Sequence, residues 1–188
     1  MTSGLREAVE AVRSGLIVGL PTDTVYGVGV DPTDLDAVAS LFELKGRPAH
    51  KPVGLLAASL EQAASVGVIT GAAADLAAKH WPGALTLIVR PRVVLSDWVG
   101  DQQQTTVGIR VPDHAVARDL LEATGPLSVT SANRSGEPEA MSDDDARGIF
   151  GDDVAVYLPG RSTGGEASTV VALTGTEIVV LRQGPVRL

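Results

Sequence analysis

Two of the three lysines in the chain, Lys45 and Lys51, lie within seven residues of each other, and Arg47 lies between them. Three cationic side chains this close repel one another unless an anion binds among them. The whole chain carries a net charge of −8, so the cluster does not belong to a generally basic surface. A small polyanion such as a nucleoside triphosphate would suit it. The alternative is the solvated end of a helix, where cations are also favourable.

Polar residues also follow the apolar run at 16–20. The segment 21–29, P-T-D-T-V-Y-G-V-G, places hydroxyl groups, a carboxylate and two glycines directly after that run. Hydroxyl groups at a strand end can bind a polar ligand, and glycine permits a close approach of the backbone. The same residue types also build a capped turn, so this segment alone leaves both interpretations open.

Two single arginines lie in or after other apolar runs. Arg110 belongs to the run 106–111, where a buried guanidinium requires either a protein carboxylate or a bidentate anionic ligand. Arg182 follows the run 178–181. The segment 128–136, S-V-T-S-A-N-R-S-G, likewise leads from an apolar stretch into a loop rich in hydroxyl and amide groups. Ligands of open sheets gather at such strand ends.

Several common catalytic motifs are absent from the sequence. It has no P-loop, no G-x-G-x-x-G after the first apolar run, and no H-E-x-x-H or other paired-histidine metal motif. The absence of cysteine excludes disulfides, thiolate nucleophiles and cysteine metal sites. Phosphate binding would therefore depend on side-chain cations and on backbone amides outside the standard loops.

Composition narrows the class of protein. A length of 188 residues predicts a single domain over 1–188. Aromatic residues make up 3% of the chain and the pI is about 4.8, and both values argue against a nucleic-acid binder that stacks bases on a basic face. No apolar run is long enough to span a membrane, and the N-terminus lacks a signal-peptide pattern, so we expect a cytoplasmic protein.

Hydrophobic periodicity and turn residues predict the order of helices and strands. Helices are expected at 3–14, 31–45, 60–66, 72–80, 113–124 and 144–150. Strands are expected at 16–20, 53–57, 84–90, 106–111, 127–130, 154–158, 168–173 and 178–181. The early alternation of strands with helices and the late run of strands favour an α/β fold with a twisted, mixed sheet and flanking helices.

Six motifs together resemble one family. In order, they are P-T-D-T-V-Y-G-V-G, K-G-R-P with the downstream Lys51, W-P-G-A-L-T, T-V-G-I-R-V-P-D-H, S-A-N-x-S-G and L-R-Q-G-P. Their order and approximate spacing over residues 16–185 are similar to those of the YrdC family, the threonylcarbamoyl-AMP synthases. The resemblance implies a twisted, mostly parallel mixed sheet with a large, concave and positively charged groove.

The resemblance also implies an activity. Family members combine L-threonine, bicarbonate and ATP to give threonylcarbamoyl-AMP and pyrophosphate. A separate threonylcarbamoyl transferase complex then modifies tRNA, so tRNA contact by this chain is expected to be indirect or weak. A Mg²⁺ ion is expected on the ATP phosphates, although the sequence shows no obvious protein cage for it.

Site residues follow from the matched motifs. The resemblance places Lys45, Arg47 and Lys51 at the reacting phosphates as the catalytic cations. The expected ATP-binding residues are Lys45, Arg47, Thr106, Asn133 and Arg182. The expected threonine-binding residues are Thr22, Arg110 and Ser131, and Arg110 is expected to bind the threonine carboxylate. No protein metal ligand is predicted.

The sequence departs from the longer relatives in two ways. Their extra C-terminal domain is not expected in a chain that ends at Leu188, and a histidine that helps to hold threonine there aligns with Leu56 here. Both features suggest the short bacterial type. Two other functions stay open: a carbamoyl-adenylate-forming domain of the kind found in hydrogenase-maturation proteins, and an RNA-binding module that uses the same groove.

Overall fold

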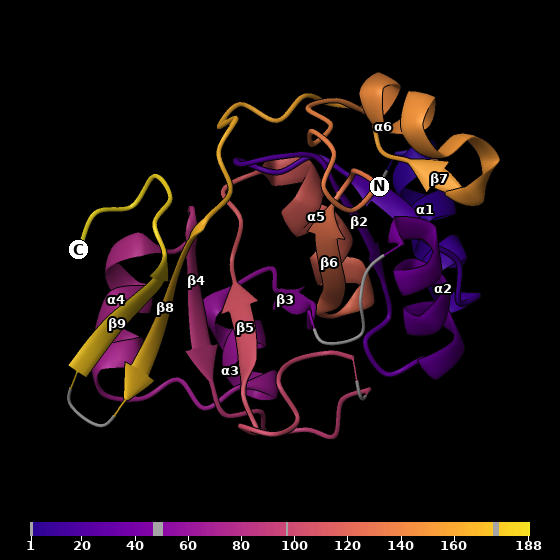
Figure 1. Cartoon of the computed structure of the whole chain (residues 1–188). Coiled ribbons are helices and arrows are strands. Elements are labelled where there is room, and N and C mark those ends of the chain that lie inside the picture. Colours follow the sequence, from indigo (N-terminus) through magenta and orange to yellow (C-terminus); the bar gives the residue numbers. More distant parts are fainter. Residues whose placement is uncertain (1, 47–50, 97, 175–176) are drawn as a thin grey trace.

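The computed structural model describes residues 2–46, 51–96, 98–174 and 177–188, and it alternates short strands with helices along most of the chain (Figure 1). Its helices are α1 (Ser3–Arg13), α2 (Leu35–Lys45), α3 (Leu60–Val66), α4 (Ala72–His80), α5 (Ala115–Thr124), α6 (Asp143–Phe150) and the 3₁₀ turn η1 (Gly151–Asp153). Its strands are β1 (Val18–Leu20), β2 (Gly27–Val30), β3 (Gly54–Leu56), β4 (Leu85–Val89), β5 (Val107–Arg110), β6 (Leu127–Ser131), β7 (Val156–Tyr157), β8 (Thr169–Thr174) and β9 (Glu177–Arg182).

Local capping fixes the ends of α2, the helix that carries Lys45. The Asp34 carboxylate accepts hydrogen bonds from the N–H groups of Asp36 and Ala37, at 3.1 and 3.0 Å, and so satisfies two of the donors at the helix start. Gly46 ends the helix in the left-handed conformation, with φ 57°. The predicted helix end at Lys45 is therefore confirmed, and the cationic cluster begins in the last turn of α2.

The described strands form one sheet of nine, in the order β7-β1-β2-β6-β3-β5-β4-β8-β9. Parallel pairing joins β1 to β7, β3 to β5 and β4 to β8. The other five neighbouring pairs are antiparallel. The mixed α/β sheet is thus confirmed, but the expectation of a mostly parallel sheet is wrong. The short connections from β1 to β2 and from β8 to β9 favour antiparallel neighbours.

Strand β2 was not expected, because two glycines within four residues are unusual in a strand. The structure gives the reason. A Cβ atom placed on Gly27 or Gly29 would lie 2.8 or 2.7 Å from the side chain of Val129 on the neighbouring β6. The glycines therefore make room for a side chain from the adjacent strand, and this contact depends on the tertiary fold.

Two hydrophobic clusters hold helices against the sheet. One joins α1 to α5 through Ala8, Val12, Leu120 and Leu121, which are all at most 3% exposed. The larger cluster includes buried residues of α2, α4 and α6 together with the central strands. Figure 1 shows α3, α4 and α5 behind the strands, with β8 and β9 at one edge of the sheet.

Gly54 should tolerate no larger side chain. A Cβ atom at this position would lie 2.7 Å from the carbonyl oxygen of Gly108, on the paired strand β5. We expect Gly54→Ala to lower the free energy of unfolding by about 1–3 kcal/mol, because the backbone of a central strand must shift. Urea denaturation measures the change. Gly148→Ala, where a Cβ would meet nothing within 4 Å, is the matched control, and equal stabilities for the two variants would contradict the prediction.

Candidate functional site

A cavity of about 330 Å³ lies against the sheet and gathers residues from segments far apart in the sequence. Five of the residues predicted for the site line it: Thr22, Thr106, Arg110, Ser131 and Arg182. They come from the β1–β2 connection, from β5 and the residue preceding it, from the end of β6 and from the end of β9. The volume is within the range of small-molecule sites. These five residues therefore share one concavity, and their roles toward ligands stay predictions.

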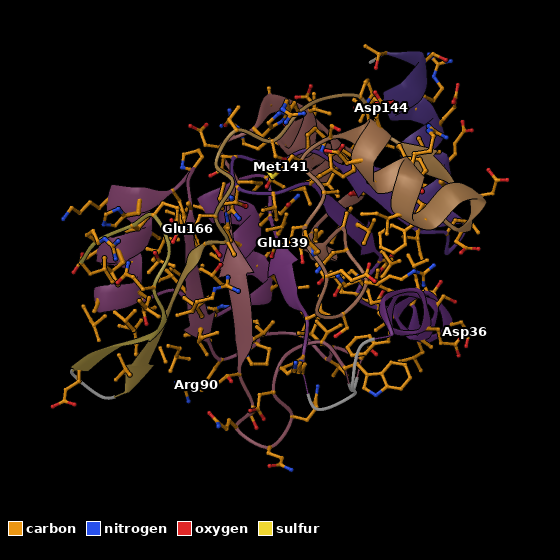
Figure 2. All side chains as sticks on the ribbon, turned by 45° about the horizontal axis from the view of Figure 1, so that its top comes forward. Asp36, Arg90, Glu139, Met141, Asp144 and Glu166 are labelled. Atoms are coloured by element: carbon orange, nitrogen blue, oxygen red, sulfur yellow. The ribbon has the colours of Figure 1, made fainter. Side chains whose placement is uncertain are left out.

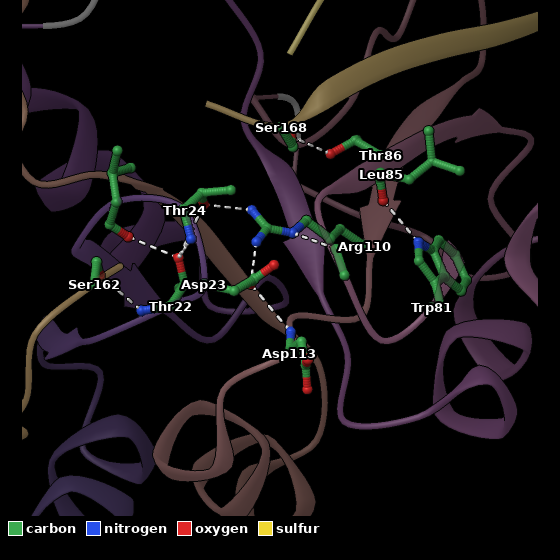
Figure 3. A network of polar contacts seen from close by, with 12 residues as sticks. Thr22, Asp23, Thr24, Trp81, Leu85, Thr86, Arg110, Asp113, Ser162 and Ser168 are labelled. Carbon is green, nitrogen blue, oxygen red and sulfur yellow. Dashed lines mark hydrogen bonds and ion pairs between the residues drawn. The ribbon is translucent and has the colours of Figure 1, made fainter. Parts of the chain in front are cut away.

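Arg110 is the most constrained cation of the cavity. It is 6% exposed, and its Nη2 forms an ion pair with Asp23. Its Nε donates to the Gly83 carbonyl at 3.0 Å, and its Nη1 donates to the Thr24 hydroxyl at 2.7 Å (Figure 3). Each terminal nitrogen keeps a second N–H group, so the guanidinium can still bind a carboxylate. Arg110 therefore has the protein partner that its burial required and retains donors for a ligand.

The turn after β1 holds these partners in place (Figure 3). The Thr22 hydroxyl donates to the Val25 carbonyl at 2.7 Å and accepts from the Thr24 N–H at 3.1 Å. Its oxygen also lies 3.0 Å from the Thr24 hydroxyl, which must be the donor because the Thr22 proton is already used. The Thr22 hydroxyl is thus fully occupied, and it fixes Thr24 for its contact with Arg110.

Arg182 approaches the cavity from the edge of the sheet. Its Nε donates to the Ser168 carbonyl at 2.9 Å and its Nη2 to the Ser168 hydroxyl at 3.1 Å. The Ser168 hydroxyl lies 2.7 Å from that of Thr86 on β4. Arg182 stays exposed, and Ser168, the residue before β8, holds its guanidinium at the cavity.

The two arginines differ in how their charge is compensated. Burial lowers the pKa of Arg110, Asp23 raises it, and the nearby Arg182 lowers it again. Partial burial also lowers the pKa of Arg182, whereas Glu139 raises it. Both guanidinium groups stay protonated at neutral pH. Asp23 pairs directly with Arg110, whereas no described residue forms an ion pair within 4 Å of Arg182, so the Arg182 guanidinium has no carboxylate in direct contact.

Lys45 corrects one expectation. An exposed position in the groove was expected, but this side chain is only 3% exposed. Its ammonium donates to the carbonyls of Ser131 and Asn133, at 2.5 and 2.6 Å, and to the Asn133 Oδ1 at 2.5 Å. Lys45 thus lies behind Ser131 and holds the loop after β6. A buried ammonium needs such acceptors, and carbonyls at the end of a strand provide them.

Three further residues predicted for ATP binding or catalysis, Asn133, Lys51 and Arg47, are not among the described residues that line the cavity. Asn133 is 8% exposed, accepts a hydrogen bond from the Ser131 hydroxyl at 2.7 Å and donates to the Glu137 carbonyl at 2.6 Å, so its amide organises the loop. Lys51 is exposed, next to the cavity-lining Pro52. Arg47 lies outside the described residues. The roles of these three residues toward ATP stay predictions.

Sequence reasoning gave no role to Ser168, Thr86 or the Gly83 carbonyl, all of which position an arginine. Thr86 had a weak signal, as the polar residue of W-P-G-A-L-T within an apolar run. The Gly83 carbonyl had none, because a backbone contact leaves no trace in the residue type. Tyr26, one of the hydroxyl groups of segment 21–29, serves the fold, because its hydroxyl donates to the Leu158 carbonyl at 2.7 Å in the core.

His114 should make stability depend on pH. Burial lowers its pKa below 6.5, although Asp23 and Asp113 oppose this, and its Nδ1 is buried without a partner among the described residues. The folded protein therefore binds fewer protons than the unfolded chain, so this contribution to stability is complete above pH 6.5 and is lost as the pH falls through the lower, folded value. His114→Gln should flatten the dependence of urea stability between about pH 7.5 and 5.5. An unchanged slope would refute this assignment.

No group of three or more His, Cys, Asp or Glu residues among the described ones is placed to hold a metal ion. Within those ranges, no helix is both long and apolar enough to cross a bilayer.

The fold and the cavity define an α/β protein with a cavity against a mixed sheet, lined by two arginines. The chain belongs to the Sua5/YciO/YrdC family, described as telomere recombination, whose match covers residues 10–184. This finding confirms the family expected from the six motifs.

Individual relatives support this assignment. The chain is 44% identical over 185 residues to a putative threonylcarbamoyl-AMP synthase of Mycobacterium tuberculosis strain H37Rv, covering 97% of this chain and 85% of the relative. It matches the crystal structure of Pyrococcus abyssi Sua5 complexed with L-threonine with a TM-score of 0.88 and 36% identity, over 96% of this chain and 54% of that one. The chain therefore spans about half the length of the Pyrococcus protein. Escherichia coli YciO matches with a TM-score of 0.86 and 26% identity, over 96% and 88% of the two chains.

Proposed function

We propose that this chain synthesises threonylcarbamoyl-AMP from L-threonine, bicarbonate and ATP and releases pyrophosphate, as the first step of a tRNA modification. The observation that carries the proposal is the presence of Arg110 and Arg182 in one cavity, one guanidinium paired with Asp23 and the other not. A carboxylate and a phosphate chain are different anionic groups. They suit two guanidinium groups of which one is paired with a carboxylate and the other is not. Relatives named threonylcarbamoyl-AMP synthases, at 33–44% identity over nearly the whole chain, support it.

In this proposal Arg110 binds the threonine carboxylate. Its two remaining terminal N–H groups would form the bidentate contact, while Gly83, Thr24 and Asp23 hold the guanidinium plane in position. Thr22 contributes by orienting Thr24, since its own hydroxyl has no capacity left. Ser131 faces the same cavity from β6, and Leu56 on β3 offers an apolar wall to the threonine methyl group. The L-threonine bound to the Pyrococcus Sua5 structure supports a threonine site in this fold.

Arg182 binds the phosphates of ATP in this proposal. Arg182 lines the cavity, and its two bonds to Ser168 hold the guanidinium in place. Thr106, the residue before β5, would lie along the nucleotide. Lys45 would act by fixing the Ser131–Asn133 loop, and Arg47 and Lys51 would add the cations nearest the leaving phosphates.

The reaction then needs no protein nucleophile. The threonine amine, once deprotonated, forms a bond to the carbon of bicarbonate, and loss of water gives the carbamate. A carbamate oxygen attacks the α-phosphorus of ATP, the bond to the bridging oxygen breaks, and pyrophosphate leaves. Both reactants are anionic, so catalysis consists mainly of positioning and charge neutralisation by the cationic side chains.

A magnesium ion on the phosphates would neutralise part of their charge. Mg²⁺ commonly binds substrate phosphates with only one or two carboxylates from the protein. Asp101 and Glu139 are the carboxylates that line the described cavity, and Asp101 accepts a hydrogen bond from Gln104 at 3.0 Å. The described residues thus fit an ion held mainly by ATP rather than by a protein cage.

We infer that residues 1–188 act as a single YrdC-like domain, in the cytoplasm. The product would pass to a threonylcarbamoyl transferase complex, which makes the contact with tRNA.

Exchange of labelled pyrophosphate into ATP tests the activity. We expect exchange only when both L-threonine and bicarbonate are present. Exchange that requires carbamoyl phosphate instead would assign the chain to the carbamoyl-adenylate-forming class. Tight tRNA binding without any exchange would favour an RNA-binding module.

A further inference from the structure

Glu139 brings a negative charge into a cavity that is expected to bind anions. The charged residues that line the described cavity are Asp101, Arg110, Glu139 and Arg182. A carboxylate in such a place repels the phosphates of a nucleotide, so its presence requires an explanation.

The backbone around Glu139 is firmly held. The Ala140 N–H donates to the Ala132 carbonyl, and the Ala140 carbonyl accepts from the Tyr26 N–H, both at 2.9 Å. Two residues earlier, the Glu137 carbonyl accepts from the Asn133 amide at 2.6 Å. Figure 2 shows Glu139 near the middle of the molecule, over the central strands, whereas Asp36 and Asp144 lie at the periphery. The backbone on both sides of Glu139 is therefore held beside the cavity, and the exposed Glu139 side chain belongs to the cavity lining.

The charge of Glu139 acts on Arg182. The two residues line the same cavity, and Glu139 raises the pKa of Arg182. No hydrogen bond or ion pair within 4 Å joins them in the described part of the chain. Unlike Glu139, Asp101 has a structural contact, because its carboxylate caps the turn before Thr106. Arg110 already has Asp23 as its ion-pair partner. Glu139 is thus a carboxylate held near Arg182 without contact.

We propose that Glu139 weakens the binding of polyphosphates at Arg182, so that the cavity discriminates among ligands by their negative charge and releases pyrophosphate readily. This inference rests on the proposed function, which places phosphates at Arg182. The repulsion grows with the charge of the ligand, so it is larger for ATP and pyrophosphate than for AMP, and small for zwitterionic threonine. Salt screens it, because Glu139 and Arg182 are both exposed to solvent.

Glu139→Gln isolates the charge, because it keeps the size and shape of the side chain. Isothermal titration calorimetry with ATP, pyrophosphate, AMP and L-threonine, in EDTA at low ionic strength, measures each affinity. We expect ATP and pyrophosphate to bind about 3- to 10-fold more tightly to the variant, AMP to gain less, and threonine to be unchanged. The gain should shrink at about 0.5 M salt, where the screening length is only a few Å.

Glu137→Gln is the matched control. This variant carries the same chemical change on the same loop, but Glu137 does not line the described cavity. The Glu137 variant should therefore bind all four ligands with the affinities of the wild type. Equal or weaker ATP binding by the Glu139 variant would overturn the inference, and so would a selective loss of threonine affinity, which would make Glu139 a ligand of the amine. A wild-type protein that binds neither ATP nor threonine would instead overturn the proposed function itself.

Discussion

Lys45→Ala should destabilise the protein as well as inactivate it. The substitution removes the ammonium that donates to three oxygen acceptors on Ser131 and Asn133, and it opens a cavity behind the loop after β6. The expected loss in the free energy of unfolding is about 2–4 kcal/mol, from the lost hydrogen bonds and the lost packing of the alkyl chain. Urea denaturation at neutral pH measures it.

Lys79→Ala is the control for this prediction, because Lys79 is exposed in the last turn of α4 and its loss should change stability by at most about 0.5 kcal/mol. A lysine that binds phosphate at an exposed groove would behave differently. Its removal would abolish activity and leave the urea midpoint unchanged, and that result would contradict the buried position of Lys45.

Arg182→Gln should reduce the formation of the adenylate by about 10²–10³-fold, because the cavity loses the guanidinium that is not directly paired with a carboxylate. Stability should change by less than about 1 kcal/mol, since the side chain is partly exposed and its two bonds go to Ser168 alone. Product formation under saturating threonine and bicarbonate, together with a thermal melt, measures both quantities.

Arg187→Gln provides the comparison for Arg182. It removes the same charge five residues later, at an exposed position that does not line the described cavity. Similar activities for the two variants would mean that Arg182 acts only through the net charge of the protein, against our assignment.

Local signals predicted most of the elements. Helices α3 and α4 fall on their predicted bounds, because alanine-rich periodicity and the stop at Trp81–Pro82 are encoded within a few residues. The predicted strand 84–90 likewise contains β4. Strand β2 and the antiparallel majority of the sheet depend on which strands meet in space, and sequence spacing alone does not determine that.

The sequence predicted the two arginines of the candidate site but not the burial of Lys45. Residues such as Arg110 and Arg182 are conspicuous because a cation follows or interrupts an apolar run, and both do line the cavity. The burial of Lys45 was not predictable in this way, since a lysine at a helix end is ordinarily exposed. Its position follows from the loop after β6, whose carbonyls come from residues more than 80 positions away.

A crystal structure with L-threonine and a non-hydrolysable ATP analogue would show whether the two arginines bind the two substrates. We predict the threonine carboxylate within hydrogen-bonding distance of the terminal nitrogens of Arg110, and phosphate oxygens within that distance of Arg182, in the one cavity. Threonine bound away from Arg110, or a triphosphate that leaves Arg182 in contact with solvent only, would contradict it.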